Sequence, residues 1–117
     1  MPISNEKYKG NIVEESLEDS RILNKLTIRG IKITNEENPL ERWHIYTVYV
    51  TEKEIQTLSK QIKPKWYMHF WRDKKIIVVF KDKTFVLDST DKTSWNDAIK
   101  HGLSLGIPKA QLDFPID

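Results

Sequence analysis

The feature that most constrains the fold is a series of three short apolar runs between residues 66 and 88. Each run has the length and the residue types of a β-strand. Polar dipeptides between such runs are typical of tight turns, so the series predicts an antiparallel meander of two hairpins. The runs are 66–72, 75–81 and 84–88, and the predicted turns are Asp73-Lys74 and Asp82-Lys83.

Two-residue turns predict that Trp71 lies opposite Ile76, His69 opposite Val78, and Phe80 opposite both Tyr67 and Phe85. Because side chains alternate along a strand, the pattern makes both faces of the meander apolar. We expect two helices to cover the face that holds His69. The other face needs its own cover, either the N-terminal segment, the tail with Leu112, Phe114 and Ile116, a ligand, or a second copy of the chain. That other face carries Trp66, Met68, Phe70, Ile77, Val79 and Val86.

The two helices are predicted from capping signals and helical spacing. Thr51 and Glu54 have the spacing of a capping box, and the apolar positions that follow predict a helix over 52–62 that Pro64 ends. Ser94 and Asp97 resemble a second capping pair, which predicts a helix over 94–105. Before the first helix, residues 42–50 alternate as a strand, with Trp43, Ile45, Thr47 and Tyr49 on one face and His44, Tyr46, Val48 and Val50 on the other.

The N-terminal third predicts a short strand around Ile12, a helical turn capped by Asp19 or Ser20, and a strand over 27–34 with a bulge at Gly30. Together these elements predict a single α+β domain over 1–117, with 1–9 as a flexible tail. Its architecture is a two-layer antiparallel sheet of five or six strands with two or three helices.

Composition narrows the function classes. The chain contains no cysteine, which suits a reducing cytoplasm and removes thiolate chemistry, and no apolar run approaches the ~20 residues of a membrane span. Net charge is +2 and lysine outnumbers arginine, a balance that disfavours nucleic acid as a partner. No metal-ligand spacing or phosphate-binding motif is present, so we expect no cofactor.

Two sets of side chains are candidates for a site. Trp66, Met68 and Phe70 predict an apolar surface for a small ligand, a protein partner or a homodimer. His69 is the candidate general acid or base of an enzyme, with Tyr67 on the same face and Asp88 at the end of the third run. We favour a non-enzymatic binding module that uses the aromatic sheet face or its rim.

The alternatives are a small enzyme built on His69 and a weak single-stranded nucleic-acid binder. The last draws on basic residues interleaved with Trp66, Tyr67 and Trp71, a combination that can bind a strand by charge and stacking. The same lysines also suit turns and strand edges, which they keep soluble.

The runs WYMHFW at 66–71 and LGIP at 105–108, with QLDFP at 111–115, resemble those of small uncharacterised prokaryotic proteins. The resemblance covers most of the chain from about Ile12. It implies a self-contained prokaryotic domain and carries no reaction, ligand or site residue.

Overall fold

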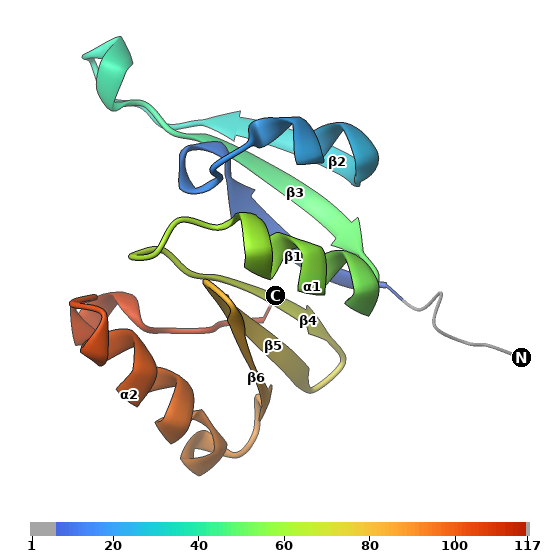
Figure 1. The fold of residues 1–117 in the computed structure, drawn as a ribbon, viewed down its shortest axis with the longest axis vertical. Helices are drawn as coiled ribbons and strands as arrows, with labels where there is room; N and C mark the ends of the chain where they lie inside the picture. Colours follow the sequence, from blue (N-terminus) through green and yellow to red (C-terminus); the bar gives the residue numbers. More distant parts are fainter. Residues whose placement is uncertain (1–6, 117) are drawn as a thin grey trace, which may run out of the picture.

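The computed structural model describes residues 7–116, which form one antiparallel sheet of six strands in the order β2-β3-β1-β4-β5-β6 (Figure 1). The fold is α+β and a single domain, as predicted. The tail expected over 1–9 lies partly outside the described residues, but Tyr8 and Lys9 belong to β1 in the middle of the sheet. The strands are β1 (Tyr8–Val13), β2 (Thr27–Ile33), β3 (His44–Val50), β4 (Met68–Arg72), β5 (Lys75–Phe80) and β6 (Lys83–Asp88).

Both predicted hairpins form. The first has the predicted register, with Trp71 opposite Ile76. The second turn is one residue earlier than predicted, so Val78 rather than Phe80 lies opposite Phe85. A register change of two residues keeps every side chain on its predicted face.

Two aspartates fix these turns. Asp73 and Asp82 have φ of 55° and 60°, a left-handed conformation that aspartate tolerates better than most residues. Asp82 is also anchored to α1 (Glu52–Gln61), because its N–H donates to the carbonyl of Ser59 at 3.0 Å and its carboxylate accepts from Lys60 Nζ at 3.0 Å. These contacts favour Asp82 as the second residue of the turn, whereas the sequence pattern predicted it as the first.

The first helix begins as predicted and the second does not. In α1 the Thr51 N–H donates to Glu54 Oε1 at 2.9 Å and the Glu54 N–H donates to Thr51 Oγ1 at 3.2 Å, a complete capping box. The predicted Ser94–Asp97 cap of α2 (Asn96–Ser104) is wrong, because Ser94 lies inside a 3₁₀ turn, η4 (Lys92–Trp95). The Asp91 side chain starts that turn by accepting from the Thr93 N–H at 3.1 Å.

The remaining short helices are 3₁₀ turns in the connections. Asp19 caps η2 (Ser20–Lys25) by accepting from the Arg21 N–H, as predicted. The bulge predicted in β2 also forms, where the register with β3 shifts between Ile28 and Gly30. The 3₁₀ turns are η1 (Glu14–Ser16), η2 (Ser20–Lys25), η3 (Pro39–Glu41), η4 and η5 (Lys109–Gln111).

The two helices cover opposite faces of the sheet, contrary to the expectation that both cover the His69 face. One buried cluster joins Ile55 and Leu58 of α1 to Met68 and Phe70 of β4, with Leu23 of η2 beside them. Because both meander faces are apolar, the stripe of α1 fits either one and its pattern does not select a face. The expected two layers therefore become three over β4–β6.

The second buried cluster contains the other face of the meander, α2 and the C-terminal segment (residues 112–116). Leu112 and Phe114 of that segment are buried against Trp95 and Val78. The chain's own segments thus cover both faces of the meander. None of the helices in the described residues is long and apolar enough to cross a membrane.

Candidate functional site

Within residues 7–116, half of one sheet face has neither a helix nor the C-terminal segment packed on it. Figure 1 shows α2 and the C-terminal segment beside β4–β6, away from β2 and β3. On the strands β2, β3 and β1, the side chains of this same face belong to neither buried cluster, and none of them is buried. The strand register defines this surface, which we call the open face: Lys9, Asn11, Val13, Thr27, Gly30, Lys32, Ile45, Thr47 and Tyr49.

The charge of the open face has one sign. Its two ionisable side chains other than Tyr49 are Lys9 and Lys32. Arg29, which the bulge of β2 leaves out of the register, places its guanidinium carbon 5.5 Å from the centre of the Tyr49 ring. No carboxylate is among the open-face residues, so the charged side chains on and beside this face are all cations.

A cleft of about 460 Å³ adjoins the open face at Val13. The rings of Trp43 and Trp66 meet edge to face along it, with 5.2 Å between their centres. Trp43 is 44% exposed, an unusual position for the largest aromatic side chain. We call this the tryptophan cleft; its lining is Val13, Trp43, Lys65, Trp66, Tyr67, Ile107 and Gln111.

Backbone contacts hold the two tryptophans in place. The Trp43 N–H donates to Thr34 Oγ1 at 2.8 Å and its carbonyl accepts from the Thr34 N–H at 3.1 Å, which extends the β2–β3 pairing. The Trp66 N–H donates to the carbonyl of Lys63 at 3.2 Å, in the turn that follows α1. Among the described residues of the lining, Lys65 is the one with a charge. Such a cleft suits a planar ring that stacks on a tryptophan and carries a negatively charged group near Lys65.

Trp66, Met68 and Phe70 do not form a common accessible surface. Met68 is 4% exposed and Phe70 is fully buried, both under α1 and η2. Only Trp66 reaches the surface, as one wall of the tryptophan cleft. Of the predicted surface, only Trp66 at its edge is accessible.

His69, Tyr67 and Asp88 do not converge. His69 Nε2 lies 2.9 Å from the carbonyl oxygen of Pro115. The Tyr67 hydroxyl donates to the carbonyl of Gln111, and burial raises its pKa. Both side chains thus bind the backbone around the C-terminal segment.

Asp88 lies far from His69 and Tyr67. His69 pairs with Val78, and Val78 pairs with Phe85 on the next strand. Asp88 lies three residues farther along that strand, so about 14 Å separates the backbones of Asp88 and His69. Its carboxylate accepts from the hydroxyl and N–H of Thr90, and these bonds lower its pKa. Asp88 therefore fixes the turn after β6.

A polar cluster on the opposite side of β3 was not anticipated. His44 Nδ1 lies 2.8 Å from Glu15 Oε2, and the Tyr46 hydroxyl donates to Glu14 Oε1 at 2.8 Å. The hydrogen bond to Glu15 raises the pKa of His44; partial burial acts to raise the pKa of Glu15, but its bonds with His44 outweigh this and lower it. These bonds fix η1 against β3. Within residues 7–116, no three His, Asp or Glu side chains gather in a way that could hold a metal ion.

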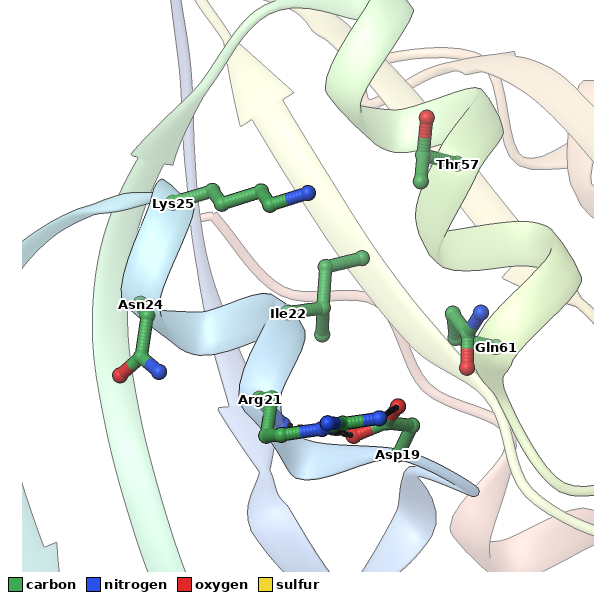
Figure 2. A pocket seen from close by; sticks show the side chains of 7 residues that line it. All are labelled: Asp19, Arg21, Ile22, Asn24, Lys25, Thr57 and Gln61. Carbon is green, nitrogen blue, oxygen red and sulfur yellow. Dashed lines mark hydrogen bonds and ion pairs between the residues drawn. The ribbon is translucent and has the colours of Figure 1, made fainter.

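A second hollow, of about 390 Å³, lies between η2 and α1 (Figure 2). Ile22 projects into it, and Lys25 extends across it toward α1. The Arg21 guanidinium is folded onto its neighbour Asp19, with N–O distances of 2.9 and 2.7 Å. Ile22 is thus the one apolar residue in the lining of this hollow, and two of its charged residues, Arg21 and Asp19, pair with each other.

Comparison of the chain with protein-family models, with curated proteins and with solved structures finds no match. The alternation of 42–50 did place Trp43, Ile45, Thr47 and Tyr49 on one face. What it lacked was the neighbouring strand order, which brings Lys9 and Lys32 onto that face.

Proposed function

We propose that the protein is a non-enzymatic binding module whose ligand site is the tryptophan cleft together with the open face. The observation that carries the proposal is the Trp43–Trp66 pair, with Trp43 44% exposed, at the rim of a half-sheet face on which no helix or C-terminal segment of residues 7–116 packs. Large aromatic side chains are costly to leave in water, and contiguous exposed apolar or aromatic surfaces usually mark interaction sites.

The proposed site therefore lies at the rim of the meander, whereas the sequence predicted a site at its centre. Burial of Met68 and Phe70 under α1 leaves them no access to a ligand. A cytoplasmic setting remains part of the proposal, supported by the absence of cysteine. Association of two copies would use a surface other than Met68 and Phe70.

A planar anionic dye tests the site. We expect 8-anilinonaphthalene-1-sulfonate to bind in the cleft, with its rings on Trp43 and its sulfonate near Lys65. Trp43→Ala should weaken binding about tenfold, because one aromatic stack contributes ~1–3 kcal/mol. Leu103→Ala is the matched control, because Leu103 is 46% exposed on α2, outside the cleft.

The measurement is the rise of dye fluorescence on titration, followed for the wild type and both variants. Equal affinities of wild type and Trp43→Ala would contradict the proposed site. Equal losses in both variants would contradict it too, because they would show that the dye reports exposed apolar surface in general.

A further inference from the structure

We infer that the ligand of this site is single-stranded nucleic acid, with phosphates on the cations of the open face and bases on its aromatic rings. The inference rests on the proposed function and names its partner. It departs from the expectation drawn from net charge, because the charge is distributed unevenly over the molecule.

The charged side chains are distributed unevenly over the molecule. The whole chain has a net charge of only +2, yet Lys9, Lys32 and Arg29 stand together on or beside a surface without a carboxylate. Lys65 continues the positive charge into the cleft. Four cations along one surface match the negative charge of a phosphate backbone.

The two acidic side chains that follow β1 directly have partners on the opposite side of the sheet. Glu14 and Glu15 bond to Tyr46 and His44, whose side chains alternate with those of the open face along β3. The fold thus separates the charges of neighbouring residues onto two sides of the sheet. A cationic surface of this kind is not evident from the sum of the charges.

Aromatic side chains also favour single-stranded nucleic acid as the ligand. Tyr49 lies at one end of β3, with the Arg29 guanidinium over its ring, and Trp43 lies just before the other end. Six residues of extended strand place them about 20 Å apart. Aromatic rings and arginine planes on a sheet surface are the elements on which unpaired bases stack.

The same features select a single strand over a duplex. The bases of a duplex are stacked on one another, so the faces of Trp43 and Tyr49 have nothing to receive from it. Backbone phosphates alone would leave the aromatic ends of the site unused. We therefore expect a clear preference for single strands of either sugar type.

Fluorescence anisotropy of labelled ten-nucleotide oligo-dT and oligo-U in 50 mM salt tests the inference. Contacts from four cations predict that the binding constant falls about 50-fold between 50 and 200 mM salt, since each contact contributes ~0.7 to the slope for single strands. Arg29→Glu/Lys32→Glu should weaken binding at least tenfold and make the salt dependence shallower. Trp43→Ala should weaken it about tenfold.

Lys25→Glu/Lys53→Glu is the matched control. It changes the net charge by the same amount. Both residues are exposed on the opposite side of the sheet, Lys25 at the hollow between η2 and α1 and Lys53 at a pocket beside it. We expect this control to bind within twofold of the wild type. An equal loss in the control would overturn the inference, because it would show attraction to total charge alone.

The outcomes separate the inference from the proposed function. If the dye binds at Trp43 but neither oligonucleotide binds, the inference fails and the binding module stands. If neither the dye nor the oligonucleotides bind, both fail. Tighter binding of a ten-base-pair duplex than of either single strand would also overturn the inference.

Discussion

Replacing Phe114 by alanine tests whether the C-terminal segment is part of the core. The Phe114 ring is fully buried and lies 5.5, 5.8 and 5.3 Å from the ring centres of Tyr67, His69 and Trp95. Removal of a buried phenylalanine side chain costs ~3–5 kcal/mol, depending on how far the neighbours collapse into the space. Tyr67 and His69 are only partly buried and can move, which favours the lower end, about 3 kcal/mol.

The assays are urea unfolding, which gives the free energy of unfolding, and thermal unfolding, both followed by circular dichroism and by tryptophan fluorescence. At ~4 °C per kcal/mol for a domain of this size, the melting temperature should fall by about 12 °C. Ile116→Ala is the control, because Ile116 is 39% exposed and should cost less than ~1 kcal/mol. A loss below ~1 kcal/mol for Phe114→Ala would refute the view that this segment belongs to the core.

Three further changes test particular contacts. Gly10→Ala should destabilise the domain by ~3 kcal/mol or more in urea unfolding, because its methyl would lie 2.3 Å from a ring carbon of buried Phe70; near-wild-type stability would show that β1 and β4 are farther apart. Thr51→Ala should cost ~1 kcal/mol by loss of the cap, and no change in melting temperature would argue against that cap. His44→Gln should cost most where His44 is protonated and Glu15 ionised, between their ordinary pKa values of 6.5 and 4.5.

The sign of the last prediction follows from the pKa shifts. The raised pKa of His44 gives stability that is present below pH 6.5 and is lost as the pH rises through the folded-state pKa. The lowered pKa of Glu15 gives stability that is present above pH 4.5 and is lost as the pH falls through its folded-state pKa. A stability difference between wild type and His44→Gln that grows from pH 6 to pH 9 would contradict the pairing.

Local signals predicted much of the fold. The meander, the Thr51–Glu54 capping box and the bulge before Gly30 all depend on residues close in sequence, and all three form. The second hairpin register depended on contacts of Asp82 with α1, which are distant in sequence. That is why its position was predicted one residue too late.

The side on which α1 packs could not be read from its own pattern. Its apolar stripe, with Ile55 and Leu58 at its centre, fits either apolar face of the meander. The choice buries Met68 and Phe70 and leaves the opposite half-face of β2, β3 and β1 open. For this reason Met68 and Phe70, two of the three residues predicted to form a binding surface, are buried in the core.

The sequence predicted only part of the open face. Alternation placed Trp43 and Tyr49 together, but neither Lys9 nor Lys32 lies near them in the chain. Only the strand order, with β3 between β2 and β1, brings these charges beside the aromatic rings. Net charge sums over both sides of the sheet and so concealed the separation.

Chemical-shift mapping tests the central claim most directly. Uniformly ¹⁵N-labelled protein would be titrated with ten-nucleotide oligo-dT in 50 mM salt and followed through backbone amides and indole N–H signals. We expect the largest changes at Lys9, Lys32, Tyr49 and the indoles of Trp43 and Trp66, with α1 and η2 unchanged. Changes centred on Lys25 and Lys53 instead, or none at any concentration, would contradict the assignment of the open face as the binding site.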